Sequence, residues 1–201
     1  MSMKAAVITL TSVRNYGTQL QALATQAKLG EFYDEVEFIN YCRPDTYGKG
    51  LVSSYAKGNP IRGAAILPTM AVWHYKFGKF QRQYLHLTDK KYETAEDFAQ
   101  YKQDADIFFT GSDQVWNAGW NDGIIPFLYL SFVRSDKPKV AFSSSFGRNK
   151  LSPKEIASCK PYLDQFKEIS IREESGKKIL TDDFHYDNVT RLVDPLSLIH
   201  I

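Results

Sequence analysis

The chain has 201 residues, of which 43% are hydrophobic and 14% aromatic, enough for a sizeable hydrophobic core. Its 25 Lys and Arg residues nearly balance its 23 Asp and Glu residues, and the net charge of +2 is too small to indicate binding to nucleic acid or to an anionic membrane. The N-terminal segment lacks the pattern of a signal peptide, and no stretch has the roughly 20 apolar residues of a membrane span. We therefore expect a globular, cytoplasmic protein.

The two cysteines, Cys42 and Cys159, support the same interpretation. They lie far apart and show no CxxC or Cys/His spacing, which fits a reducing compartment and argues against a zinc site. We expect both to be small buried core residues, and we expect neither a metal ion nor a bound cofactor.

The first 41 residues predict a strand, a helix and a second strand. Residues 5–10 form a nearly continuous apolar run, typical of a strand buried on both faces of a parallel sheet. After a polar loop over 11–18, apolar residues recur at the helical period over 19–29, and Gly30 suits the end of that helix. Because residues 35–41 alternate as a second strand, these segments together predict a βαβ unit.

The next segment, 43–68, is interrupted by glycines and prolines. We expect it to leave the sheet, with no more than a short helix over 61–67. From 73 to 87 large apolar residues recur every three or four positions, which predicts an amphipathic helix whose apolar face packs in the core. A capping box at 94–97 begins a short helix, and residues 104–110 are predicted to form a central strand.

The second half of the chain continues the alternation of strands and helices. Residues 139–143 predict a strand, and a capping box at 152–155 begins a helix that ends near residue 166. Two further strands are expected at 168–172 and 189–194, with a helix over 173–180 between them. This alternation predicts an α/β fold with a Rossmann-like, doubly wound, mostly parallel sheet.

The stretch 105–117 places a cluster of polar side chains where the central strand ends. In open α/β sheets ligands bind outside the carboxyl ends of the strands, so such a cluster belongs to a candidate binding site. The alternative is a helix-capping turn with Trp116 in the core. The candidate residues are Gly111, Ser112, Asp113, Gln114, Trp116 and Asn117.

Other loops follow predicted strands and belong to the same edge of the sheet. Asn15 and Gly17 precede the first helix, where a glycine lets a ligand approach backbone N–H groups, although a simple turn is the alternative. Arg172 can bind a phosphate or carboxylate through its planar guanidinium, or it can pair with the two glutamates that follow it. No GxGxxG, GxSxG, P-loop or HExxH motif is present, so dinucleotide-binding, serine hydrolase, NTPase and zincin functions have no support.

Six short motifs occur in order along nearly the whole chain. They are Asn-Tyr-Gly-Thr-Gln-Leu-Gln-Ala at 15–22, Glu-Phe-Ile-Asn-Tyr at 37–41, Thr-Gly-Ser-Asp-Gln-Val-Trp-Asn at 110–117, Ser-Ser-Ser-Phe-Gly at 143–147, Ile-Ser-Ile-Arg-Glu-Glu-Ser-Gly at 169–176 and Val-Asp-Pro at 193–195. Together they resemble the polysaccharide pyruvyl transferase family, and Gly-Ser-Asp-Gln-Val-Trp-Asn is the most specific of them.

The resemblance implies an activity and a wider architecture. The chain would be the N-terminal half of a bacterial enzyme with two domains, similar to the GT-B glycosyltransferases. That enzyme would act in exopolysaccharide biosynthesis, transferring the enolpyruvyl group of phosphoenolpyruvate to a sugar as a ketal. A glycosyltransferase that uses a nucleotide sugar and a non-catalytic binding module are the alternatives.

The resemblance also implies roles for the residues. Arg172, in the Ser-x-Arg motif, would help to hold phosphoenolpyruvate, while Asn15, Gly17 and residues 111–117 would line a cleft for a sugar or lipid-linked oligosaccharide acceptor. No catalytic residue is assigned in this chain, because the family's proposed catalytic histidine and further basic residues would lie in a C-terminal domain.

The end of the chain suggests a boundary. The six residues at 196–201 are what one reading frame of a common sequencing-library transposon end encodes, so we expect residues 1–195 to be one domain and 196–201 a non-native tail. The alternative is a genuine apolar C-terminal strand. On the first hypothesis the C-terminal domain is missing and the chain is an inactive fragment, with apolar surface left exposed near Trp116 and Trp120.

Overall fold

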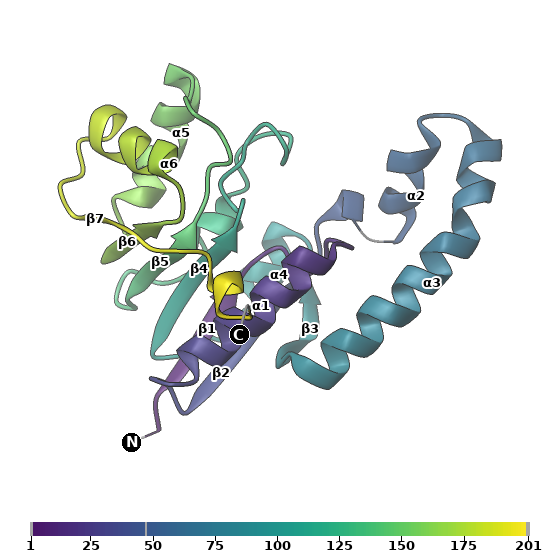
Figure 1. The fold of residues 1–201 in the computed structure, drawn as a ribbon, viewed down its shortest axis with the longest axis horizontal. Helices are drawn as coiled ribbons and strands as arrows, with labels where there is room; N and C mark the ends of the chain where they lie inside the picture. The colour runs from purple at the N-terminus through teal and green to yellow at the C-terminus, as the bar shows by residue number, and fades with distance from the viewer. Residues whose placement is uncertain (1, 47, 200–201) are drawn as a thin grey trace.

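The computed structural model describes residues 2–46 and 48–199, and within these ranges seven strands form one parallel sheet (Figure 1). The strand order is β3-β2-β1-β4-β5-β6-β7, and every neighbouring pair runs parallel. The strands are β1 (Lys4–Ile8), β2 (Glu35–Tyr41), β3 (Leu87–Tyr92), β4 (Ile107–Asp113), β5 (Lys139–Ser144), β6 (Glu168–Ile171) and β7 (Val189–Arg191). The order is that of a doubly wound sheet, which confirms the α/β prediction and is consistent with a Rossmann-like fold.

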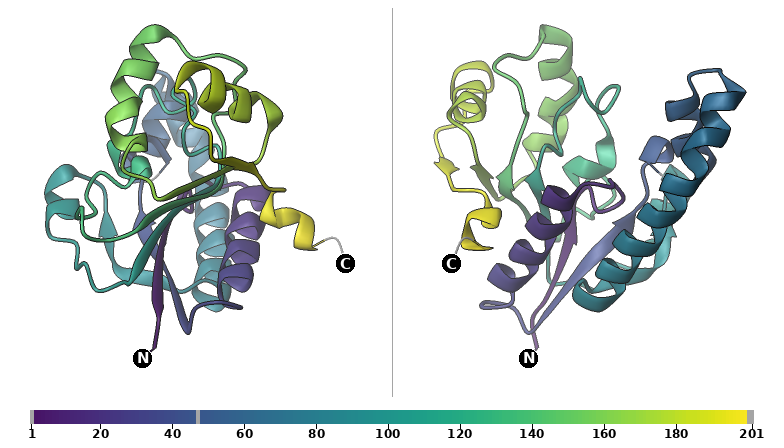
Figure 2. Two further views of the ribbon diagram at one scale, coloured as in Figure 1. Left: turned by 90° about the vertical axis from the view of Figure 1, so that its left-hand side faces the viewer. Right: turned by 45° about the vertical axis from the view of Figure 1, so that its right-hand side comes forward.

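Helices and helical turns connect the strands and cover both faces of the sheet (Figure 2). None of the helices in the described ranges is long and apolar enough to cross a membrane. The α-helices are α1 (Tyr16–Leu29), α2 (Gly48–Ala56), α3 (Pro60–Tyr84), α4 (Ala95–Ala99), α5 (Pro153–Leu163) and α6 (Glu174–Lys178). The shorter turns are η1 (Pro44–Thr46), η2 (Pro126–Tyr129), η3 (Ile179–Asp183) and η4 (Pro195–Ile199).

The interior strand β1 explains why both faces of the sheet are covered. Because side chains alternate along a strand, Ala5 and Val7 face one core, where they pack with α1 and the chain just after α3. Ala6 and Ile8 face the other core, which includes residues of α4, η2, α5 and η3. All four side chains are fully buried, as the continuous apolar run predicts.

The largest difference from the sequence predictions lies between β2 and β3. A helical hairpin of α2 and α3 replaces the expected short helix, and α3 runs for 25 residues through Pro68. The expectation that the apolar face of the 73–87 helix is core holds for Phe77, whereas Tyr84 is exposed and Leu87 belongs to β3. The chain after α3 was not predicted to be a strand because its sequence, Leu-Thr-Asp-Lys-Lys-Tyr, is largely polar at the edge of the sheet.

Smaller differences concern where elements end. The strand β4 continues through Asp113 instead of stopping at Thr110, and within this extension Gly111 pairs with Phe142 and Asp113 with Ser144 of β5. The last strand is shorter than expected, and the helix after β6 ends in the π-helical turn η3. Cys42 and Cys159 are both buried and unpaired, as predicted, and burial raises the pKa of the Cys159 thiol to about 12.

Gly111 allows β4 and β5 to approach closely. Its φ is +107°, and a Cβ at this position would lie 2.5 Å from the carbonyl oxygen of Phe142 and 2.6 Å from Ser144 Oγ. Gly123 has a similar φ of +115° but open space around it. The two glycines therefore separate the effect of backbone conformation from that of the close contact.

We expect Gly111→Ala to lower the free energy of unfolding by about 3 kcal/mol, because it adds a steric clash to an unfavourable φ. Gly123→Ala is the matched control and should cost about 1 kcal/mol, from the φ alone. Urea unfolding followed by circular dichroism measures both. Equal losses for the two variants would show that the contact with β5 is unimportant.

Candidate functional site

The loops singled out from the sequence meet where the direction of winding reverses, between β1 and β4. The loop over 9–15 leaves β1 and the loop over 114–117 leaves β4, and these strands are neighbours in the sheet. The strand ends of β5 and β6 lie beside them on the same edge. A crevice at such a position is the usual ligand site of doubly wound sheets.

Asn15 and Gly17 form the start of α1. The Asn15 side-chain oxygen accepts hydrogen bonds from the backbone N–H groups of Gly17, at 2.7 Å, and Thr18, at 3.3 Å. The first turn of the helix is thus capped by the chain itself. A ligand that used these N–H groups would have to displace Asn15.

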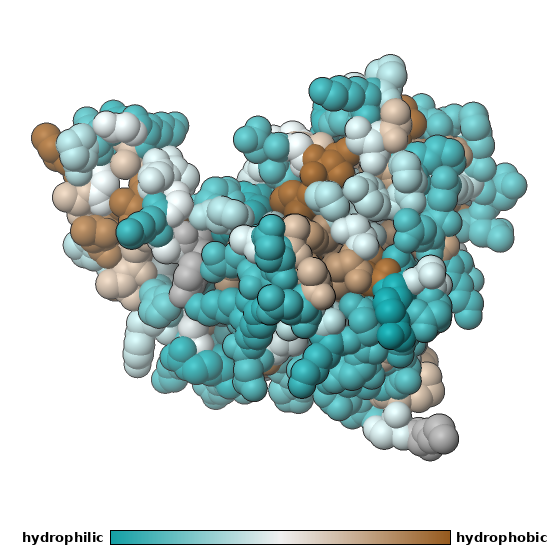
Figure 3. Space-filling model, turned by 180° about the vertical axis from the view of Figure 1, so that it is seen from behind, coloured by the Kyte–Doolittle hydropathy of each residue, from teal (hydrophilic) through white to brown (hydrophobic). Residues whose placement is uncertain are grey.

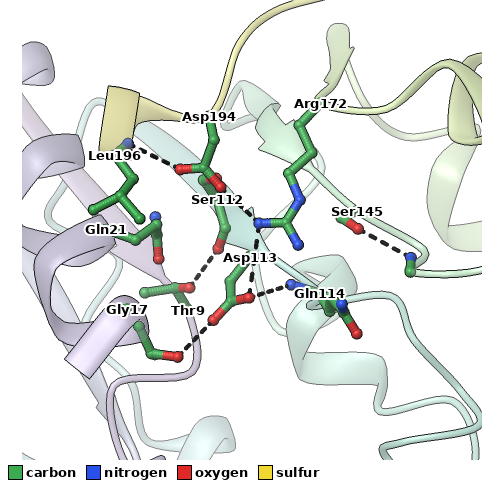
Figure 4. Close-up of polar contacts among 12 residues, drawn as sticks. Thr9, Gly17, Gln21, Ser112, Asp113, Gln114, Ser145, Arg172, Asp194 and Leu196 are labelled. Atoms are coloured by element: carbon green, nitrogen blue, oxygen red, sulfur yellow. Dashed lines mark hydrogen bonds and ion pairs between the residues drawn. The ribbon is translucent and has the colours of Figure 1, made fainter. Parts of the chain in front are cut away.

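Asp113 joins β4 to α1 (Figure 4). Its Oδ2 accepts a hydrogen bond from Thr18 Oγ1 at 2.9 Å, and its Oδ1 accepts one from the backbone N–H of Gln114 at 2.8 Å. Its φ of +92° is unfavourable for a residue with a side chain, and such backbone strain is concentrated at functional sites. Thr9 adds a second connection, because its hydroxyl donates to the carbonyl oxygen of Ser112 at 2.7 Å.

Arg172 lies at the end of β6 among three carboxylates. Its Nη1 is 2.6 Å from Asp194 Oδ2 and 3.9 Å from Asp113 Oδ1, and its Nε is 3.6 Å from Glu173 Oε2. Its side chain keeps 23% of its surface exposed. Arg172 therefore faces the candidate site, but this group of four charges is net negative and attracts an anion only weakly by itself.

Trp116 does not reach the surface, so the expectation that it contacts a ligand is not met. It is 1% exposed, stacks on Tyr129 with ring centroids 5.4 Å apart, and donates its indole N–H to the carbonyl oxygen of Leu128 at 3.2 Å. Its backbone N–H donates to the carbonyl oxygen of Ser145 at 3.1 Å, and its ring also packs against Phe146 and Phe166. The predicted exposed apolar surface is likewise absent at Trp116, although Trp120 is 45% exposed.

Gln114 and Asn117 bond to each other. Asn117 Nδ2 donates to Gln114 Oε1 at 2.7 Å, and Asn117 Oδ1 accepts from the backbone N–H of Trp120 at 3.1 Å. Gly147, with φ +59°, makes room for this pair, since a Cβ there would lie 2.5 Å from Gln114 Oε1. The two amides thus shape the loop, and Gln114 is the more accessible of them.

Three buried oxygens near the switch between β1 and β4 lack a hydrogen-bond partner within the described ranges: Thr11 Oγ1, Gln21 Oε1 and Ser112 Oγ. Leaving such an atom unsatisfied costs about 1–3 kcal/mol, and water or a ligand commonly satisfies it. Figure 4 shows that Gln21 and Ser112 lie beside the group formed by Asp113, Arg172 and Asp194. The interior of the protein next to Asp113, Arg172 and Asp194 is therefore polar.

Sequence reasoning did not assign roles to Thr18, Gln21 or Asp194. Each lies within one of the six ordered motifs, Thr18 and Gln21 in the first and Asp194 in the last. Their presence in these motifs was the sequence signal that could have identified them as site residues. In the described part of the chain, no group of three or more His, Cys, Asp or Glu side chains has the arrangement of a metal site.

A groove borders the site on the side of the helical hairpin. It has a volume of about 430 Å³ and lies between the α2–α3 hairpin and the loops after β1, β2 and β4. The guanidinium of Arg43 stacks over the Trp120 ring at 4.4 Å, beside this groove. Its lining residues are Val13, Arg14, Asp45, Thr46, Leu51, Ser54, Tyr55, Lys57, Trp73 and Trp120.

The strand order defines a doubly wound α/β protein, a class in which ligands usually bind at the topological switch point. A model of the polysaccharide pyruvyl transferase family matches residues 15–199, which extend from the cap of α1 into η4. The chain therefore belongs to the polysaccharide pyruvyl transferase family, as its six motifs predict, and the family indicates a pyruvyl transferase-like function. No curated protein and no solved structure matched the chain.

We expect the ion pair between Arg172 and Asp194 to stabilise the site measurably. In a double-mutant cycle of Arg172→Met and Asp194→Asn, the coupling free energy should be about 1–2 kcal/mol, because both groups are largely shielded from water. Urea unfolding of the single and double variants gives this value.

The exposed pair of Arg191 and Glu174, whose atoms are 3.4 Å apart, is the control for this cycle. Its coupling, measured with Arg191→Met and Glu174→Gln, should be only a few tenths of a kcal/mol. If both cycles gave the same coupling, Asp194 would not be holding Arg172 in place.

Proposed function

We propose that this protein takes part in transferring the pyruvyl group of phosphoenolpyruvate to a sugar of a cell-surface polysaccharide. The observation that carries the proposal is the family match, which spans nearly the whole chain. The position of Arg172 supports it, because a partly exposed guanidinium near the carboxyl ends of the strands can bind a carboxylate or phosphate.

The reaction sets requirements that can be compared with the site. The methylene carbon of phosphoenolpyruvate gains a proton, its central carbon forms bonds to two sugar hydroxyl oxygens, and phosphate leaves with the other hydroxyl proton. Such chemistry needs an acid and cations at the phosphate and carboxylate. Arg172 is our candidate for one of those cations, and Asp113 for the group that accepts a hydrogen bond from a sugar hydroxyl.

The charges around Arg172 indicate that the donor site needs basic groups from elsewhere in the enzyme. Asp113, Glu173 and Asp194 outnumber the one guanidinium, and Arg148 is paired with Glu155. A highly charged donor would need further basic groups above this edge of the sheet. We therefore propose a GT-B-like arrangement in which a second domain supplies them together with the catalytic acid, and in which the enzyme acts in the cytoplasm.

The groove beside the hairpin is our proposed site for the acceptor sugar. Aromatic rings offer apolar faces on which sugar rings can stack, and Trp73, Tyr55 and the exposed Trp120 line this groove. Asp45 adds a carboxylate for sugar hydroxyls. In this arrangement, Asn15, Gly17, Asp113 and Gln114 line the cleft between the donor and this groove, where Asp113 can accept a hydrogen bond from a sugar hydroxyl. Gly111, Ser112 and Asn117 shape the chain beneath them.

The donor site can be tested by titrating the chain with phosphoenolpyruvate in a calorimeter. We expect Arg172→Met to weaken binding roughly tenfold, because a charge-assisted bidentate contact is lost. Arg191→Met, which removes an exposed arginine on β7, should leave binding unchanged. Equal binding by both variants, or binding of a nucleotide sugar in place of phosphoenolpyruvate, would contradict the proposal.

The acceptor site can be tested by saturation-transfer NMR with a panel of methyl glycosides. We expect Trp120→Ala to abolish the transfer signal and Trp120→Phe to retain most of it, because an aromatic face remains. Phe32→Ala, which removes an exposed ring far from the groove, is the control. An unchanged signal in Trp120→Ala would place the acceptor elsewhere.

A further inference from the structure

The α2–α3 hairpin has an unusual charge. Residues 48–84 contain six basic residues and no Asp or Glu, while the whole chain has a net charge of only +2. The rest of the chain is therefore net acidic, and the small overall net charge does not reveal that basic residues are concentrated in the hairpin. All six basic side chains are exposed: Lys49, Lys57, Arg62, Lys76, Lys79 and Arg82.

The hairpin also exposes an apolar helix face. On α3, residues 61, 65, 68, 72 and 75 follow one another at spacings of three or four, so they share one side of the helix. Of these, Ile61 is 78% exposed, Val72 50% and Tyr75 64%. The opposite side packs inward, where Gly63 contacts α2 and Phe77 contacts Tyr16 of α1.

This face has no partner within the described part of the chain. Figures 1 and 2 show α2 and the N-terminal half of α3 projecting beyond the edge of the sheet. Figure 3 shows the same hairpin standing apart from the body of the molecule, with hydrophobic surface on it. A helix with an exposed apolar face and basic residues beside it can bind a surface that is both negatively charged and partly apolar.

We propose that the α2–α3 hairpin docks on an anionic lipid bilayer. The outer face of α3 would enter the headgroup region, and the surrounding lysines and arginines would contact lipid phosphates. A second copy of the chain is a poorer occupant, because two acid-free basic surfaces repel each other. The inference does not depend on the proposed transferase activity, since the outer face of α3, Lys76 and Lys79 lie outside both the Arg172 group and the lining of the groove.

Vesicle co-sedimentation of the full chain, without phosphoenolpyruvate or sugar, tests the proposal. We expect at least about tenfold tighter binding to vesicles that contain 30% phosphatidylglycerol than to pure phosphatidylcholine, and loss of that preference in 0.5 M salt. Lys76→Glu with Lys79→Glu should remove the preference. Val72→Asp, at an exposed position, should weaken binding to the anionic vesicles at least tenfold, because it places a charge in the apolar face.

Lys150→Glu with Lys154→Glu is the matched control, because it makes the same change in net charge at exposed positions away from the hairpin. It should retain binding, and the circular dichroism spectra of all variants should be unchanged. Equal binding to both kinds of vesicle, or an equal loss in the control, would overturn the proposal. So would an absence of vesicle binding together with dimers, detected by ultracentrifugation, that Val72→Asp dissociates.

Discussion

Parallel pairing of β1 with β4 brings Ala5 beside Ile107, with the whole hairpin and β3 inserted between them in the sequence. Because the strands are parallel, both chains leave the sheet at the same edge, and because the winding reverses there, their connections diverge to opposite sides. Thr9, Thr18 and Asp113 close the resulting gap with hydrogen bonds from side chains. The position of the candidate site is thus a consequence of one strand pairing.

The two halves of the sheet differ in electrostatic character. On the β4–β7 side a single guanidinium, Arg172, lies among Asp113, Glu173 and Asp194. On the β1–β3 side, every Lys, Arg, Asp or Glu residue over 48–84, in the connection between β2 and β3, is basic. Since both features lie at the carboxyl edge or extend from it, a molecule approaching that edge meets a net acidic cluster of side chains next to a basic helical hairpin. A net charge near zero therefore conveys little about this surface.

The parts of the fold that could be predicted are those whose sequence signal matches their burial. The residues at 5–8 are apolar and fully buried, so β1 was recognisable, whereas β3 is largely polar at a sheet edge and was not. The long helix α3 was obscured because Gly63 and Pro68 normally interrupt helices. The pairing of Arg172 with Asp194 depends on the register of β6 and β7, and the burial of Trp116 depends on its packing against Tyr129, Phe146 and Phe166. Neither constraint is local in sequence.

The attachment of α3 has a mechanical consequence. The helix is a rod about 38 Å long, and near its inner end Gln81 donates hydrogen bonds to the carbonyl oxygen of Thr11 and to the side chain of Gln19. The Gln19 side chain donates hydrogen bonds to the carbonyl oxygens of Thr11 and Val13. The side-chain amides of Gln19 and Gln81 therefore fix the loop that leaves β1. Through these hydrogen bonds the orientation of the hairpin is coupled to the shape of the loop that leaves β1, so we expect a change in one to alter the other.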